Sequence, residues 1–309
     1  MSAGTSAVPT AAGATSALPA AWVGFLDDAA VFPPGRAPLP RAVEQWFARL
    51  DTVLAPVAGP LVLPLDDLDA ARDQVRRLDP DRPLDVSVVV PAGRLDDALT
   101  ARSLLEPELR VAALELKVSD DDGTRRDEIA AVGRVAAELP VFVELTAGQV
   151  DDDLDLLAEH GLRLKFRTGG MEAALFPSPE ELADVIVAAV AHGVPFKLTA
   201  GLHEAVRYTD TATGFTHHGF LNIARAVDAA QHAGGNADGR DEVLSALRQT
   251  DAGPLTAWAA AGDTRWRTAF LSFGTCSIAE PLESLAGLGL FPAALLTPAH
   301  PRSHPQETR

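Results

Sequence analysis

The pattern of apolar and polar positions predicts eight buried strands. Short apolar runs rich in Val, Leu and Phe recur along the chain. They are nearly continuous, which is typical of parallel strands that are covered on both faces. The expected strands are 22–26, 60–65, 84–90, 110–118, 140–146, 162–167, 194–199 and 268–273.

Helical patterns separate most of these strands. Ser178, Pro179 and Glu181 give one helix a clear start, because Ser can cap it, Pro suits its first position and Glu at the third position completes a capping box. A strand followed by a helix recurs about every 20–30 residues, the spacing of one βα unit. The expected helices are 66–78, 94–105, 124–138, 150–160, 178–192 and 279–288.

Eight such units describe an α/β protein with a single (β/α)8 barrel. A doubly wound open sheet is the alternative, but no glycine-rich turn follows the first strand. Residues 27–59 are long for one connection, and we expect a loop and then a helix at 40–55. Residues 203–266 are longer still, and we expect an inserted segment over the C-terminal face, with a helix at 219–233, a Gly/Asp-rich linker and one or two further helices.

Composition narrows the function. The 309 residues are 47% hydrophobic, enough for a large core in one barrel domain at 21–298. A net charge of −17 argues against nucleic acid and anionic membranes as partners. The single cysteine, Cys276, permits no internal disulfide, and a cytoplasmic location is expected. We expect residues 1–20 to be a disordered leader without signal-peptide character, and 299–309 to be a flexible tail.

Charged side chains occupy the ends of several predicted strands, where active sites of barrels lie. On two of these strands, alternation puts a pair of charged residues on one face: Glu115 with Lys117, and Lys165 with Arg167. Structural ion pairing is the alternative to a site. The strand-end group comprises Asp27, Asp28, Glu115, Lys117, Glu144, Lys165, Arg167, Thr168, Lys197 and Thr199.

Two lysines on consecutive strands suggest amine chemistry. A protonated amine is a poor nucleophile, and a second cation together with burial lowers its pKa. The neutral amine can then attack a carbonyl and form a Schiff base. We therefore expect Lys165 and Lys197 to perturb each other, with a carboxylate moving protons.

The motifs "KFRTGG", "SPEE" and "FKLTAG" at 165–201 resemble those of the deoxyribose-phosphate aldolases, which are class I aldolases with a barrel fold. The resemblance covers about 110–205 and 268–288. It implies that Lys165 is the Schiff-base lysine and Lys197 the residue that lowers its pKa, with Glu115 and Asp27 in place of two family acids. The turn "FGTCS" at 273–277 matches the family's phosphate-binding turn.

The chain also departs from the family. Arg167 stands where a small polar residue is usual, Glu115 replaces Asp, and Lys117 has no clear counterpart. Ala200 interrupts a Gly-Gly pair, and the segment 203–266 has no equivalent. The expected substrate is therefore not deoxyribose 5-phosphate itself.

Two further segments are candidates for substrate contacts. The His-rich stretch after residue 202 could form a lid, a metal site or a solvated loop; its candidates are His203, Arg207, His217 and His218. The turn after the last strand could hold an anion through Gly274, Thr275 and Ser277, although a plain turn is the alternative. Cys276 is expected to be a packing residue.

Three hypotheses follow. The first is a carbon–carbon lyase that uses an imine at Lys165 on a small anionic carbonyl metabolite, without a cofactor. The second is an isomerase or lyase in which lysines and glutamates act as acids and bases, without a cofactor or with a divalent metal among Glu115, Glu144 and the histidines. The third is a non-catalytic barrel that binds an anionic metabolite. A homo-oligomer is left open.

Overall fold

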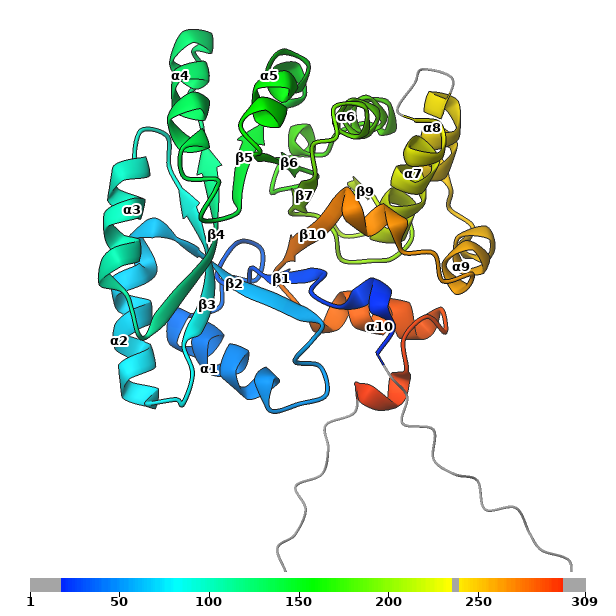
Figure 1. The fold of residues 1–309 in the computed structure, drawn as a ribbon. Helices are drawn as coiled ribbons and strands as arrows, with labels where there is room; N and C mark the ends of the chain where they lie inside the picture. The colour runs from blue at the N-terminus through cyan, green and yellow to red at the C-terminus, as the bar shows by residue number, and fades with distance from the viewer. Residues whose placement is uncertain (1–17, 235–238, 297–309) are drawn as a thin grey trace, which may run out of the picture.

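The protein is a closed barrel of eight parallel strands surrounded by helices (Figure 1), in a computed structural model that describes residues 18–234 and 239–296. The predicted (β/α)8 barrel is therefore confirmed. Around the barrel the strands follow the order β1-β10-β7-β6-β5-β4-β3-β2. Their bounds are β1 Leu26–Asp28, β2 Ala58–Pro64, β3 Leu84–Val90, β4 Leu109–Lys117, β5 Val141–Leu145, β6 Arg163–Arg167, β7 Phe196–Thr199 and β10 Phe270–Thr275.

Helices cover the outside of the barrel. In α6, Ser178 accepts a hydrogen bond from the Glu181 N–H, and Glu181 accepts one from the Ser178 N–H, so the predicted capping box is confirmed. The helices are α1 Leu39–Leu50, α2 Leu68–Leu78, α3 Leu95–Leu104, α4 Asp122–Gly133, α5 Ala147–Glu159, α6 Pro179–Ala191, α7 Phe220–His232, α8 Arg240–Arg248, α9 Ala252–Ala260 and α10 Ala279–Gly287, and the 3-10 turns are Ala20–Trp22, Leu65–Asp67, Ala173–Leu175, Arg265–Thr268 and Ala293–Leu295.

The first strand was predicted too early. Residues 20–22 form a 3-10 turn, and β1 begins only at Leu26. The apolar side chains that suggested a strand belong to an aromatic cluster instead: Trp22 and Phe25 pack on each other and on Phe220 of α7. Burial of these rings, rather than strand pairing, explains the apolar run.

Alternation along the strands separates two environments. On β6, Leu164 and Phe166 are buried, and Lys165 and Arg167 are the residues that line the barrel interior. The same alternation occurs on β7, where Phe196 and Leu198 flank Lys197. Because side chains of a strand point to opposite faces in turn, the apolar residues cover the strand face under the helices while the interior is charged.

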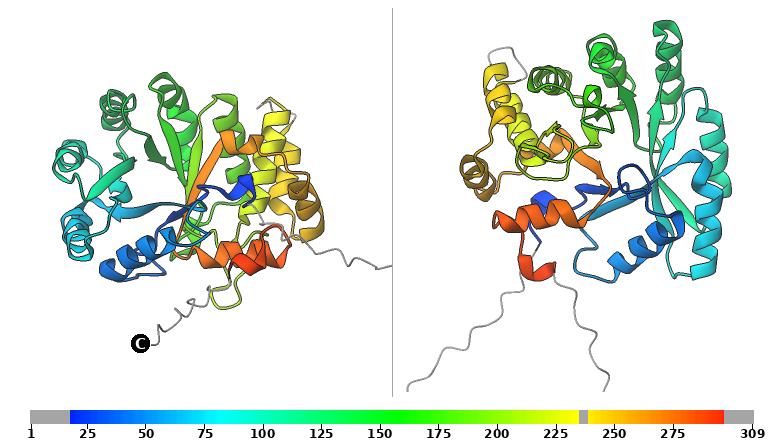
Figure 2. Two further views of the ribbon diagram at one scale, coloured as in Figure 1. Left: turned by 60° about the horizontal axis from the view of Figure 1, so that its bottom comes forward. Right: turned by 180° about the vertical axis from the view of Figure 1, so that it is seen from behind.

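The long segment after β7 lies mostly beside the barrel. It begins with a two-stranded antiparallel sheet of β8 Tyr208–Thr209 and β9 Thr216–His217. Helix α7 then takes the usual position of a barrel helix, packed against α6, and α8 packs on both (Figures 1 and 2). The sequence suggested that all of 203–266 lies over the C-terminal face, but these helices lie on the flank.

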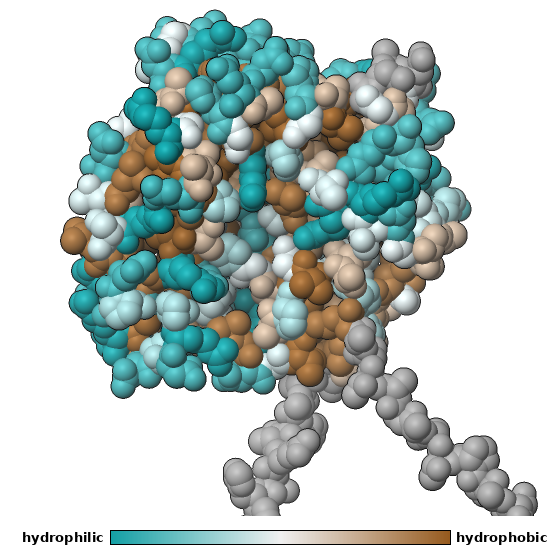
Figure 3. Space-filling model, viewed as in Figure 1, coloured by the Kyte–Doolittle hydropathy of each residue, from teal (hydrophilic) through white to brown (hydrophobic). Residues whose placement is uncertain are grey.

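The described residues form one closed barrel with its surrounding helices. Most of the leader predicted at 1–20, the tail predicted at 299–309 and the centre of the linker, 235–238, lie outside the described residues. Within the described part, no helix has the length and apolar character needed to cross a bilayer. Hydrophilic side chains cover much of the face in Figure 3, and hydrophobic ones gather beside α3 and α4.

Candidate active site

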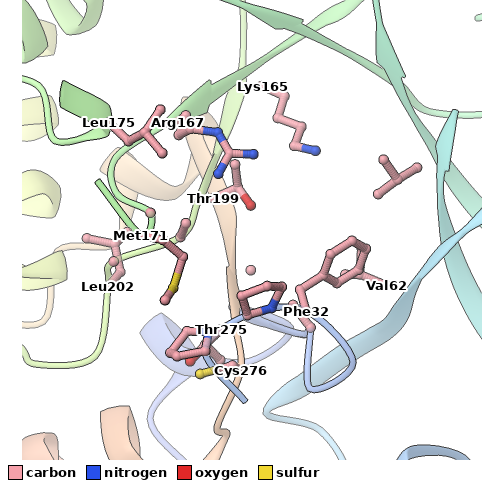
Figure 4. Close-up of a pocket in the computed structure, with 18 of the residues that line it drawn as sticks. Phe32, Val62, Lys165, Arg167, Met171, Leu175, Thr199, Leu202, Thr275 and Cys276 are labelled. Atoms are coloured by element: carbon pink, nitrogen blue, oxygen red, sulfur yellow. The ribbon is translucent and has the colours of Figure 1, made fainter. Parts of the chain in front are cut away.

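A cavity of about 260 Å³ opens among the C-terminal ends of the strands and the loops that follow them (Figure 4). Its charged floor includes Glu115, Lys165 and Lys197. Polar groups converging at the bottom of a concave pocket are typical of a small-molecule site. The lining of the cavity comprises Ala29, Phe32, Pro33, Pro34, Val62, Val89, Glu115, Lys117, Lys165, Arg167, Gly170, Met171, Glu172, Leu175, Lys197, Thr199, Ala200, Gly201, Leu202, His203, Gly274, Thr275 and Cys276.

Lys197 is held by two carboxylates. Its Nζ donates hydrogen bonds to Asp27 Oδ2 and, over 2.6 Å, to Glu115 Oε1. Ser272 donates to Asp27 Oδ2 over 2.8 Å. The amine also lies 5.3 Å from the centroid of the Phe142 ring, within the range of a cation–π contact. With the side chain 1% exposed, Lys197 has little freedom to leave this position.

Lys165 has a looser environment. Its Nζ lies 2.9 Å from Glu115 Oε2 and 2.9 Å from Glu144 Oε2. The approach to Glu144 has a hydrogen-bond distance but poor angles, so Glu144 Oε2 is buried without a well-directed donor. Glu115 thus lies between the two lysines, with one oxygen on each amine.

The carboxylates change how the two amines influence each other. Burial alone would lower the pKa of Lys197, but Asp27 and Glu115 outweigh it and hold that pKa above its ordinary value. The expectation that two close cations simply repel is therefore not supported, since Glu115 separates them.

The acids respond differently to burial. For Glu115 burial raises the pKa, but Lys165 and Lys197 outweigh this and leave the pKa well below its ordinary value. For Glu144 the same opposition leaves the pKa lowered, with Lys165 and Arg167 as the main cations. Burial dominates at Asp27, whose pKa is raised in spite of Lys197.

Two cations form an outer ring above the lysine pair. Arg167 is about one-third exposed, and its guanidinium lies 3.4 Å from Glu144 Oε1. Lys117 is exposed at the end of β4 and lines the same cavity. Both predicted substrate contacts therefore reach the pocket, where an anion could meet them. Asp28 does not, because it pairs with Arg49 over 2.6 Å outside the cavity.

Threonine and glycine after the two lysine strands have a structural role. The Thr168 hydroxyl donates to the Ala200 carbonyl over 2.7 Å, so it is occupied and does not line the cavity. Ala200 and Gly201 have φ of 67° and 79°, in the left-handed region. A Cβ on Gly169 would come 2.7 Å from the Gly201 Cα, so only glycine permits this contact between the two loops. Thr199, by contrast, lines the cavity as predicted.

Of the predicted histidines, only His203 reaches the cavity, and its Nδ1 lies 2.7 Å from Glu280 Oε2 of α10. His217 contacts the Gly201 carbonyl over 3.0 Å, and its ring stacks on Tyr208. His218 contacts the Pro177 carbonyl, and burial lowers its pKa to about 4. Arg207 contacts His218 behind the lining. His217, His218 and Arg207 therefore support the loop after β7 and do not line the cavity.

The turn after β10 contributes Gly274 and Thr275 to the lining, as predicted. Ser277 does not line the cavity, and its hydroxyl accepts a hydrogen bond from the N–H of Glu280. Cys276 also lines the cavity although the sequence suggested a packing role, and burial raises the pKa of its thiol.

Sequence analysis missed the apolar part of the lining. It consists of a loop after β1 with Phe32, Pro33 and Pro34, and a loop after β6 with Met171 and Leu175. Loops of this kind carry no periodic pattern, so the sequence gives little sign that they meet.

A compositional signal was also available. The chain has only three lysines, Lys117, Lys165 and Lys197, among 26 basic residues. All three line this cavity. Elsewhere the chain uses arginine, whose guanidinium stays protonated and forms no imine. A residue type confined to one pocket indicates that its particular chemistry is needed there.

Comparison with models of known protein families and with curated protein sequences finds no match for this chain. Among the described residues, no group of three or more His, Cys, Asp or Glu side chains is positioned to hold a metal ion.

Proposed function

We propose that the protein is a lyase that forms an imine between Lys165 and a small anionic carbonyl compound and cleaves or makes a carbon–carbon bond next to it. The observation that carries the proposal is the unequal environment of two adjacent buried lysines. Lys197 donates hydrogen bonds to two carboxylates. Lys165, which lines the same cavity as Lys197, lies 2.9 Å from Glu144 Oε2, an oxygen without a well-directed hydrogen-bond donor.

Glu144 is the base that we assign to imine formation. Its Oε2 lies 2.9 Å from Lys165 Nζ, within reach for proton transfer. Once the amine has given it a proton, the nitrogen lone pair adds to the carbonyl carbon. A second proton passes from the nitrogen to the alkoxide oxygen, which becomes a hydroxyl. This hydroxyl takes the proton held by Glu144 and leaves as water, so that an ammonium and a carbonyl become an iminium and one water.

The surrounding charges favour the iminium. An iminium carries the same positive charge as the ammonium that it replaces, so its ion pairs with Glu115 and Glu144 are retained. A preorganised charge distribution of this kind stabilises a charged intermediate at no cost of reorganisation. Lys197 keeps Glu115 ionised and in place through their hydrogen bond.

Bond cleavage then follows from the electron-withdrawing nitrogen. A hydroxyl on the carbon β to the iminium carbon loses its proton to a carboxylate and becomes an aldehyde, and the electrons of the broken bond form an enamine. The enamine carbon takes up a proton, and water hydrolyses the iminium to return the Lys165 ammonium and a second carbonyl product. The reverse sequence makes the bond.

The test is reductive trapping. Pyruvate and sodium cyanoborohydride are added to the intact protein, and peptide mapping by mass spectrometry locates the reduced adduct. We expect the adduct at Lys165 in the wild-type protein and in Lys117→Arg, which removes the exposed lysine and keeps its charge. If pyruvate, glyoxylate and acetaldehyde all fail to mark Lys165, the acid–base hypothesis without an imine replaces this one.

A further inference from the structure

We propose that the ligand of the cavity is amphipathic: a 2-oxo acid whose carboxylate lies near Arg167 and Lys117 and whose apolar chain lies against Phe32, Met171 and Leu175. The carbonyl group of this ligand rests on the proposed function. The carboxylate and the apolar chain are inferred from the distribution of charged and apolar side chains within one cavity.

The cationic side of the cavity belongs to consecutive strands. Lys117 on β4 is in register with Glu144 on β5, and Glu144 with Lys165 on β6. Arg167 follows Lys165 on the same face of β6, with its Cα about 7 Å further along the strand. Lys165, Lys197 and Arg167 each lie within ion-pair distance of a carboxylate. Lys117 has no such partner among the described residues, so a ligand carboxylate could pair with it and with Arg167.

Two loops, after β1 and after β6, supply much of the apolar side. Figure 4 shows Lys165 and Arg167 directed into a space that Met171, Leu202 and Phe32 border from other sides. Met171 is 61% exposed and Leu175 38% exposed, two of the few large hydrophobic side chains left open to solvent in the described chain. Exposed apolar side chains gathered at the rim of a pocket are typical of a ligand-binding surface.

Both loops are fixed before any ligand binds. In the loop after β1, Ala29 donates to the Thr275 carbonyl over 2.8 Å, which ties this loop to β10. A Cβ on Gly35 would come 3.0 Å from the Cβ of Cys276, so the loop packs closely on the turn after β10. In the loop after β6, a Cβ on Gly170 would come 2.3 Å from Leu175 Cδ1, so glycine allows Leu175 to fold over it. Preformed walls reduce the cost of binding.

The rim also disfavours a second anionic group. Glu172 lies on the loop after β6 beside Met171 and lines the cavity. A carboxylate at the far end of the ligand would lose its hydration against apolar side chains and meet a like charge. The pocket should therefore prefer a monocarboxylic oxo acid with an apolar chain over a dicarboxylic one.

The first experiment compares trapping rates at Lys165 for 2-oxohexanoate, pyruvate and 2-oxoglutarate. Each buried methylene strengthens binding, and we expect 2-oxohexanoate to be trapped at least about tenfold more efficiently than pyruvate. 2-Oxoglutarate should be trapped least well. Met171→Ser should lower the ratio of 2-oxohexanoate to pyruvate, whereas Leu104→Ser, which changes a side chain that is 64% exposed on α3, should leave it unchanged.

The second experiment separates this inference from the proposed function. Calorimetry measures the binding of 2-hydroxyhexanoate and lactate, which resemble 2-oxohexanoate and pyruvate but have a hydroxyl in place of the carbonyl and cannot form an imine. Tighter binding of 2-hydroxyhexanoate, weakened by Arg167→Gln and by Met171→Ser, supports the ligand class even if no imine forms. Trapping at Lys165 with equal efficiency for all three oxo acids, or equal binding of the two hydroxy acids, overturns the ligand class and leaves the imine intact.

Discussion

Lys165 and Lys197 are neighbours in register on adjacent strands, yet their surroundings differ. Lys197 donates hydrogen bonds to Asp27 and Glu115 and lies over an aromatic ring. Lys165 forms ion pairs with Glu115 and Glu144, and both lysines line the cavity. The two lysines differ in the carboxylates that they contact and not in burial, since Lys165 is 3% exposed and Lys197 is 1% exposed.

This difference separates a chemical role from a supporting one. If an amine that donates two hydrogen bonds moves or loses its proton, those hydrogen bonds are lost. An amine in looser contact with a carboxylate can give up a proton and turn towards a carbonyl. The buried pair of Arg125 with Asp153, which lies on α4 and α5 outside the cavity, supplies a third case: an ion pair with no access to a ligand.

The largest expected effect is that of Lys165→Arg. Reduced adduct at position 165 should no longer form with pyruvate, because a guanidinium keeps the charge but forms no imine. Lys117→Arg is the matched control: it also replaces a lysine of the cavity by arginine, and its adduct should still form at Lys165. A reduced adduct that moves to Lys197 in Lys165→Arg would show that the two lysines are equivalent, and the comparison would fail.

Lys197→Met should have the largest effect on stability. It leaves Asp27 and Glu115 with less compensation for their burial, and breaking a buried pair by removing one partner costs about 3 to 5 kcal/mol of the free energy of unfolding. Denaturant unfolding at pH 7 measures the loss. Asp27→Asn in the same chain should recover part of it, because the amide can still accept the Ser272 hydrogen bond.

A control distinguishes this loss from a loss of the site. Arg125→Met removes the buried one of two arginines that pair with Asp153 outside the cavity, and it should also lower the free energy of unfolding, by less because Arg126 still pairs with Asp153. Trapping at Lys165 should be unchanged in Arg125→Met. If Lys197→Met is as stable as the wild-type protein, Lys197 does not hold the carboxylates in the way that the structure suggests.

The barrel could be predicted from the sequence because buried strands leave a strong local pattern. β3 at Leu84–Val90 has the predicted bounds, and its apolar residues Leu84, Val86, Val88 and Val90 recur at every second position and are buried. The run at 22–26 is also apolar, but its aromatic side chains pack into a cluster with α7. Tertiary packing therefore decided the one strand that was misplaced.

The site was only half predictable, for a similar reason. Alternation along a strand places Lys165 and Arg167 on one face, so the charged floor followed from the sequence. The position of Glu115 between the lysines depends on the stagger of the barrel, and that of Phe32 and Met171 on two irregular loops. Neither the stagger nor the loop geometry has a local signature in sequence.

Glu144→Gln should have an intermediate effect. The amide cannot accept a proton from Lys165, and general base catalysis typically contributes at least about a hundredfold, or about 2.7 kcal/mol. We expect the rate of trapping with pyruvate to fall by about that factor, with the adduct still at Lys165. Ser87→Ala, which removes only a hydrogen bond to Glu115, is the control and should change the rate little. An unchanged rate in Glu144→Gln would assign the base to another group.

The smallest expected effect is a difference in alkaline stability. The pKa of Lys197 is raised in the folded protein because Asp27 and Glu115 outweigh its burial. Above the ordinary lysine pKa of about 10.4, the unfolded chain releases a proton that the folded chain keeps. The contribution of Lys197 is therefore complete below that pH and is lost as the pH rises, with a slope of up to about 1.4 kcal/mol per pH unit.

Other groups titrate in the same range, so the measurement needs a prepared background. Burial raises the pKa of Tyr208 to about 12 and also raises that of Cys276, and both shifts lower stability in alkali in the same direction. Burial lowers the pKa of Arg267 to about 10, which acts in the opposite direction but is common to both proteins. Unfolding free energies of Tyr208→Phe/Cys276→Ala, with and without Lys197→Met, should converge as the pH rises from 10 to 11.5. Parallel curves would mean that Lys197 is no more strongly protonated than a lysine in the unfolded chain, and its distinction from Lys165 would then lie in geometry alone.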